Sequence, residues 1–248
     1  MHLLNKYTIP FMSSEWLLVN GITIFFIIGS LIFLKNMNKN FIDKFNKYFA
    51  LILILEYFIM QIMYILHDSW SLIESLPFHL CTLMTFNTIF ILLTKKQWAF
   101  ELMLFIGLPG ALHALFTPQL NLGNDLIYMI DFFFTHGWLV MSPFYCIIVL
   151  GMKPRVKSWW FSFLRLQDII VFVFLANFVV NYISFGYILP PDLKSPTSNY
   201  MYLLELPIAD NPFVVGSWPS YLLILLLAVF IHSIIIYLPF KLTSFIKK

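Results

Sequence analysis

Apolar stretches of about twenty residues recur along the whole chain, and no other feature limits its possible folds as strongly. A helix needs roughly 20 apolar residues to cross the ~30 Å hydrocarbon core of a bilayer. The chain is 60% hydrophobic and 11% charged, with a mean hydropathy of +0.85, so it has too few charged residues to cover a water-soluble surface. We therefore expect an all-α, polytopic membrane helix bundle without a soluble domain.

The apolar stretches predict about seven transmembrane helices in a single domain that covers residues 1–248. The predicted spans are 15–34, 46–66, 76–94, 97–116, 126–150, 163–186 and 217–238. A proline-rich segment at 187–216 joins the last two spans and should cap the bundle, either as a lid over a cavity or as a stiff surface loop. Pro109 should kink the fourth span, because proline removes a backbone hydrogen bond.

The positions of lysine and arginine predict the orientation, since these residues favour the cytoplasmic side. With the spans above, the basic residues gather on one side, and only Lys6 and Lys194 fall on the other. We therefore expect a multi-pass protein of the cell membrane with its N-terminus outside and its C-terminus inside. The net charge of +3 follows from this bias and gives no reason to expect a nucleic-acid partner.

Several ionisable residues are predicted inside the bilayer, where they are costly and therefore suggest function. Those that fall in the outer half of the bundle, from four different spans, are His67, His79, Cys81, His113, Asp131 and His136. Glu56 lies deeper, near the midplane, on the helix face that also carries His67. Asn177 and Asn181 form a polar stripe on the sixth span, with Tyr182 beside them. Either hydrogen bonds between helices or a bound substrate would explain this stripe.

Cys81 is the candidate nucleophile. Pro77 suits the first turn of a helix, which would place Cys81 about one turn inside the N-terminus, where the helix dipole favours a thiolate. His79 lies about 200° around that helix from Cys81, so a base should come from another helix, and His136 or His113 meets this requirement. The alternative role for Cys81 is that of a small buried apolar residue.

Short motifs within residues 76–240 carry a family resemblance. They include Leu76-Pro77-Phe78-His79-Leu80-Cys81, Gly107-Leu108-Pro109-Gly110, His136-Gly137, Asn199-Tyr200-Met201-Tyr202-Leu203 and Trp218-Pro219. In order and spacing these motifs resemble the YwaF-type bacterial membrane proteins. That family is in turn similar to a eukaryotic transmembrane acyltransferase of ether phospholipids.

The resemblance implies that Cys81 is the nucleophile and His136 the base, with His79 as a secondary candidate. Two positions depart from the family pattern. Thr82 follows the cysteine where an acidic residue is usual, and His113 stands where glutamine is common. The first departure removes a local carboxylate, and the second adds a possible base.

These observations predict acyl transfer in the outer leaflet through a thioester on Cys81, with a phospholipid or other acyl lipid as substrate and no cofactor. Glu56 or Asp131 would orient the histidine, and Asn177 and Asn181 could stabilise an oxyanion. One alternative is a transporter or binding protein for a small or amphiphilic solute. Another is a metal-dependent lipid hydrolase, although the histidines lack the spacing of a metal motif and we expect no metal.

Overall fold

The computed structural model describes residues 6–120, 123–189, 191, 195–208, 211, 212 and 214–246. Four residues that belong to the predicted outer segment or to the basic residues used for the orientation lie outside this description. They are Pro190, Lys194, Lys247 and Lys248. The described part of the chain is an all-α bundle, as predicted, with one small addition. Two-residue strands β1 (Tyr7–Thr8) and β2 (Gln119–Leu120) pair in antiparallel fashion.

The bundle has seven helical segments among the described residues, because α4, a π-helical turn (Met103–Gly107) and α5 follow one another without a break. The helices are α1 (Ser14–Lys35), α2 (Lys39–Leu66), α3 (Leu80–Thr94), α4 (Gln97–Leu102), α5 (Leu108–Phe116), α6 (Leu126–Ile148), α7 (Ser158–Phe185) and α8 (Ser220–Ile246). A short 3₁₀ turn covers Tyr200–Tyr202.

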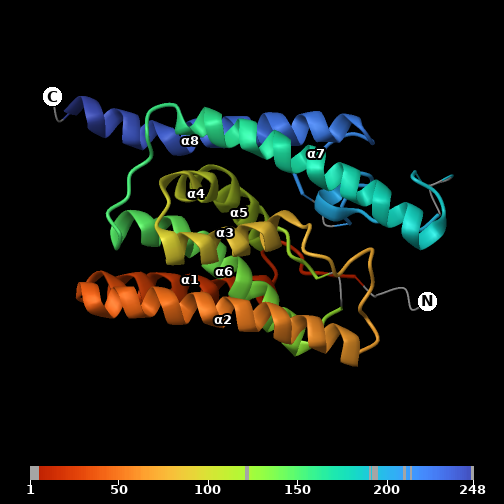
Figure 1. The fold of residues 1–248 in the computed structure, drawn as a ribbon, viewed down its shortest axis with the longest axis horizontal. Helices are drawn as coiled ribbons and strands as arrows, with labels where there is room; N and C mark the ends of the chain where they lie inside the picture. The colour runs from red at the N-terminus through yellow and green to blue at the C-terminus, as the bar shows by residue number, and fades with distance from the viewer. Residues whose placement is uncertain are drawn as a thin grey trace.

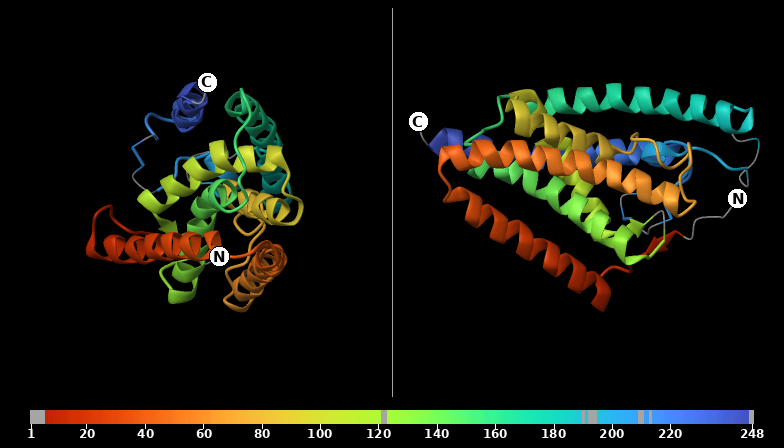
Figure 2. Two further views of the ribbon diagram at one scale, coloured as in Figure 1. Left: turned by 90° about the vertical axis from the view of Figure 1, so that its left-hand side faces the viewer. Right: turned by 60° about the horizontal axis from the view of Figure 1, so that its bottom comes forward.

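The helices form a layered bundle. α1 and α2 lie on one side, α7 and α8 lie on the opposite side, and α3 to α6 lie between them (Figure 1 and Figure 2). The segment from Gln97 to Phe116 is the most buried of the long apolar ones, whereas only a minority of the residues in α1, α2, α7 and α8 are buried. We call residues 195–208 the cap segment, and the end of the bundle where they lie the cap end.

The exposed surface identifies lipid as the surrounding solvent. Phe25 is 74% exposed, and large apolar side chains cover the outward faces of α1, α2, α7 and α8 in the same way. A water-soluble protein does not expose apolar surface on this scale. Within the described part of the chain, five segments are long and apolar enough to cross a membrane, and α3 is a shorter apolar helix. The chain is therefore a multi-pass membrane protein, while the number of seven spans and their orientation stay predictions.

The predicted spans agree with the helices within a few residues, except at three ends. α2 begins at Lys39 rather than at 46, α7 begins at Ser158 rather than at 163, and α8 continues to Ile246 rather than ending at 238. Basic residues that were predicted in a loop, such as Lys39 and Lys44, consequently lie within α2. The helices continue beyond the apolar runs that hydropathy detects, in α2 through charged and polar residues and in α7 through Trp159 and Trp160.

The start of α3 corrects a prediction that bears on the site. The span was expected to begin at 76, but α3 begins at Leu80 and His79 caps it in an extended conformation. The preceding loop is held by the Tyr200 hydroxyl, which donates to the Leu72 carbonyl at 2.6 Å and accepts from the Leu76 N–H at 2.9 Å. These tertiary bonds keep residues 72–76 out of the helix. Burial raises the pKa of the Tyr200 phenol, which therefore stays protonated.

An ion pair fixes the end of the bundle opposite the cap. The buried Glu101 of α4 accepts two side-chain hydrogen bonds from Arg155 at its second oxygen, at 2.7 and 3.2 Å. Its first oxygen accepts from the Arg155 backbone N–H at 2.9 Å. The hydrogen bond with Glu101 raises the pKa of the Arg155 guanidinium. This pair holds the loop between α6 and α7 against α4.

Candidate functional site

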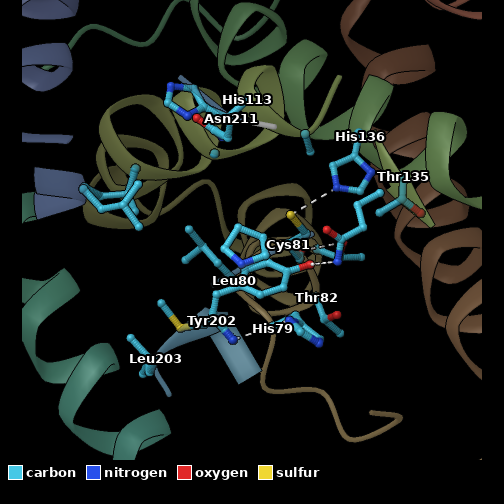
Figure 3. A pocket seen from close by; sticks show the side chains of 18 of the residues that line it. His79, Leu80, Cys81, Thr82, His113, Thr135, His136, Tyr202, Leu203 and Asn211 are labelled. Atoms are coloured by element: carbon cyan, nitrogen blue, oxygen red, sulfur yellow. Dashed lines mark hydrogen bonds between the residues drawn. The ribbon is translucent and has the colours of Figure 1, made fainter. Parts of the chain in front are cut away.

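A cavity of about 970 Å³ opens inside the cap end of the bundle, and it contains most of the polar residues that the sequence singled out. Its walls come from α2, α3, α5, α6, α7 and α8, and the cap segment covers it. Cys81 lies at the centre of this space, with His136 on one side and His113 on another (Figure 3). The volume is typical of sites for small ligands and lipids.

The structure brings Cys81 and His136 together. The His136 Nε2 lies 3.1 Å from the Cys81 Sγ, a hydrogen-bonding distance for sulfur, although the residues belong to α3 and α6 (Figure 3). Both residues line the cavity, and His136 is buried. This is one of the two cross-helix pairings that helix geometry allowed for Cys81, the other being with His113, and its role in catalysis stays a prediction.

A second hydrogen bond fixes the tautomer of His136. Its Nδ1 lies 2.7 Å from the backbone carbonyl of Phe132, one turn earlier on α6. A carbonyl can only accept, so the Nδ1 of a neutral ring carries the proton and Nε2 presents a lone pair. That lone pair faces the Cys81 Sγ, which is the arrangement of a general base beside a nucleophile.

Cys81 lies closer to the helix start than predicted. With His79 as the N-cap, Cys81 is the second residue of α3 rather than a residue one turn inside. The first-turn N–H groups of a helix have no acceptor within the helix, so those of Leu80, Cys81 and Thr82 are available as donors. The thiol therefore stands among backbone donors and near the positive end of the helix dipole.

His79 and His113 also line the cavity, but neither contacts the Cys81 sulfur through a described hydrogen bond. The His79 Nδ1 accepts a hydrogen bond of 3.4 Å from the backbone N–H of Met201 in the cap segment. His113 packs edge-to-face against His232 of α8, with ring centroids 5.2 Å apart. Sequence reasoning missed His232, which also lines the cavity. A histidine inside an apolar span is itself a signal of function, and it could have marked this residue.

The two predicted carboxyl residues meet on the opposite wall. Glu56 of α2 and Asp131 of α6 both line the cavity, and their side chains interact directly. The Thr135 hydroxyl lies 3.5 Å from Glu56, at the limit of a hydrogen bond. Thr135 precedes His136 in the chain, so Glu56 lies beside the residue next to the candidate base. No described hydrogen bond links either carboxyl to the His136 ring, whose Nδ1 is taken by Phe132.

Four predicted substrate contacts lie outside the cavity. His67 is exposed at the end of α2, where its ring packs edge-to-face on Tyr128, and Tyr182 is 64% exposed on α7. Asn177 and Asn181 are fully buried, but neither lines the cavity. The structure thus places these four side chains where a ligand in the cavity does not reach them.

The two asparagines instead hold the cap segment. The Asn177 side chain accepts from the Tyr200 N–H at 2.9 Å and from the Ser198 hydroxyl at 2.8 Å, and it donates to the Tyr200 carbonyl at 3.1 Å. The Asn181 side chain accepts from the Ser198 N–H at 2.6 Å and donates to the Ile188 carbonyl at 3.1 Å. The polar stripe on α7 is therefore explained by hydrogen bonding to this segment, which covers the cavity as a firmly anchored cap.

The described residues do not form a metal site. Among them, no group of three or more His, Cys, Asp or Glu side chains lies close enough together to hold a metal ion. The second free cysteine, Cys146, is buried in α6 and does not line the cavity.

Fold and site together define a multi-pass helical membrane protein with a cysteine–histidine pair in an internal cavity. Residues 11–237 match the TMEM164 family, so the chain belongs to that family. The match includes the first two helices, which the sequence motifs did not cover. Curated proteins gave no match, and solved structures gave none.

Proposed function

We propose that this protein is a membrane-embedded acyltransferase that moves a fatty acyl chain between lipids through a thioester on Cys81. The observation that carries this proposal is the contact of 3.1 Å between the Cys81 Sγ and a His136 nitrogen whose lone pair is fixed by the Phe132 carbonyl. A thiol that can pass its proton directly to a fixed base is equipped to form a covalent acyl intermediate.

The first half of the reaction forms the thioester. The Cys81 thiol gives its proton to the His136 Nε2, and the sulfur attacks the ester carbonyl carbon of a donor lipid. The carbon–oxygen ester bond then breaks, and His136 returns the proton to the departing oxygen. In the second half, the hydroxyl of an acceptor lipid gives its proton to His136 and attacks the thioester, and Cys81 leaves as a thiol.

The start of α3 supplies the stabilisation of the tetrahedral oxyanion. The N–H groups of Cys81 and Thr82 belong to the first turn of α3, and in our proposal they take this role in place of Asn177 and Asn181, since both asparagines hold the cap segment. Loss of one such donor typically costs about 10²–10³ in rate in other acyl-transfer enzymes.

In our proposal this chemistry takes place in the outer leaflet of the cell membrane, with the N-terminus outside. Lysines and arginines gather at the end opposite the cap, as they do on the cytoplasmic side of membrane proteins. The 15 residues of α3 extend about 22 Å, less than the ~30 Å hydrocarbon core. Cys81 therefore lies below the membrane surface, where lipid ester groups can approach it.

Purified protein in nanodiscs tests the proposal. Phospholipid with a labelled acyl chain and an unlabelled lysolipid are supplied, and labelled product is measured. We expect transfer by the wild type and by Cys146→Ala, and loss of at least about 10³-fold in Cys81→Ala. His136→Gln should lose about 10²–10⁴-fold, because the base is absent.

Retained transfer in Cys81→Ala would refute the thioester mechanism. The cavity could alternatively serve binding or transport of an amphiphile. Thermal stabilisation by the phospholipid without any turnover in wild-type protein would favour that function over acyl transfer.

A further inference from the structure

The cavity has two chemically different walls. On the side of α2 and α6 it is lined by Glu56, Asp131 and Thr135, whereas the lining face of α8 is apolar between the polar residues Ser220 and His232 at its ends. The apolar lining of α8 includes Leu222, Leu225, Leu226 and Val229, whose spacing of three, four and seven residues places them on one helical face. Leu166 and Ile170 of α7 continue this wall.

The apolar wall reaches the lipid-facing surface near the start of α8. Leu223 lines the cavity although it is 70% exposed, and the neighbouring Pro219 and Ser220 are also exposed lining residues. A residue can satisfy both conditions only where the cavity opens outward. The opening therefore lies beside the first turns of α8, a helix that packs mainly on α7 and on the π-helical turn.

The depth of the apolar wall matches a fatty acyl chain. The lining face of α8 extends from Ser220 to His232, and twelve residue steps of 1.5 Å give about 18 Å. One leaflet of the ~30 Å hydrocarbon core is about 15 Å deep, so a chain of ordinary membrane length fits along this face. Ile106 and Leu166, together with His232, line the deep end.

We infer that the acyl chain of the substrate enters the cavity laterally beside the first turns of α8 and lies along Leu222, Leu225, Leu226 and Val229. This inference rests on the proposed acyl transfer. The ester bond that would react joins the apolar acyl chain of a lipid to its polar part. Cys81 lines the cavity that both walls share, next to His136 of α6 (Figure 3). The deep part of the wall, from Val229 to His232, then limits the length of the chain.

A photoreactive phospholipid tests the location of the chain independently of catalysis. The probe carries a diazirine at the end of one acyl chain and is added to the Cys81→Ala variant in nanodiscs, which binds but forms no thioester. We expect labelled peptides from residues 222–232 or 166–170. Labelling confined to the outward faces of α1 or α2, as expected of bulk lipid, would overturn the inference.

Competition between probes with short and long chains tests the limit of length. Val229→Phe should lower labelling by the long probe relative to the short one by roughly 15-fold if two methylene groups are excluded, since each buried methylene contributes a factor of about four. Leu227→Phe is the matched control, because Leu227 is 57% exposed and does not line the cavity. Leu225→Ala, which adds space, should shift the preference toward longer chains.

An unchanged length preference in both Val229→Phe and Leu225→Ala would contradict the inference. Failure of acyl transfer itself gives a different pattern. In that case the probe still labels α8 with the predicted length dependence, while the wild type releases no labelled product.

Discussion

Replacement of Asn177 distinguishes the structural role that the hydrogen bonds assign to it from a role in catalysis. Asn177→Ala removes the bonds to the Ser198 hydroxyl, the Tyr200 N–H and the Tyr200 carbonyl, all of them buried. A net loss of about 1 kcal/mol for each bond gives about 3 kcal/mol, and more where a buried group stays unpaired. The cap segment should therefore loosen, and the free energy of unfolding should fall by at least this amount.

Equilibrium unfolding in mixed micelles, with increasing SDS, measures this loss. Hydrogen exchange should report faster exchange at residues 198–205 and at the loop before α3, because Tyr200 links the two. Ser184→Ala is the control, since Ser184 is exposed on the same helix and no described hydrogen bond involves it. Its stability should stay within about 0.5 kcal/mol of the wild type.

Wild-type stability and hydrogen exchange in Asn177→Ala, together with a fall in acyl transfer of 10²-fold or more, would contradict the structural role. That outcome is the one expected of an oxyanion donor, and it would assign Asn177 a role in catalysis.

Two further predictions concern packing at the core and at the end opposite the cap. Arg155→Ala should cost about 2–3 kcal/mol of stability in the same SDS titration, because it leaves the buried Glu101 carboxylate without its guanidinium, and Glu101→Gln should cost less. Equal losses in the two variants would contradict this account. Gly107→Ala should cost about 1–3 kcal/mol, since the added methyl group would overlap the Met103 sulfur, whereas Gly29→Ala meets open space and should be neutral. Similar unfolding curves for both glycine variants would show that the core tolerates the added volume.

Helix geometry limited the expected partner of Cys81 to two candidates, His136 and His113. Both fell at the predicted depth of Cys81 and on other helices, and the family resemblance pointed to His136. The pairing depends on the depth of each span and on the 100° advance per residue, and both follow from the sequence alone.

The residues whose positions were not predicted depend on long-range packing. His232 has no local motif, and its contact with His113 arises from the packing of α8 beside the central segment. Asn177 and Asn181 were placed correctly on one helix face, but their partners come from the cap segment, which has no periodic pattern. Met201 and Tyr202 in that segment have positive φ angles of 58° and 55°, a conformation that the sequence did not indicate.

Intact-mass spectrometry of the protein after exposure to a phospholipid donor, without acceptor, tests the central claim most directly. We predict a gain of one acyl chain that maps to the Cys81 peptide, is removed by hydroxylamine, persists in Cys146→Ala and is absent from Cys81→Ala. An adduct on another residue, or full lipid transfer by a protein that lacks the Cys81 thiol, would contradict the account.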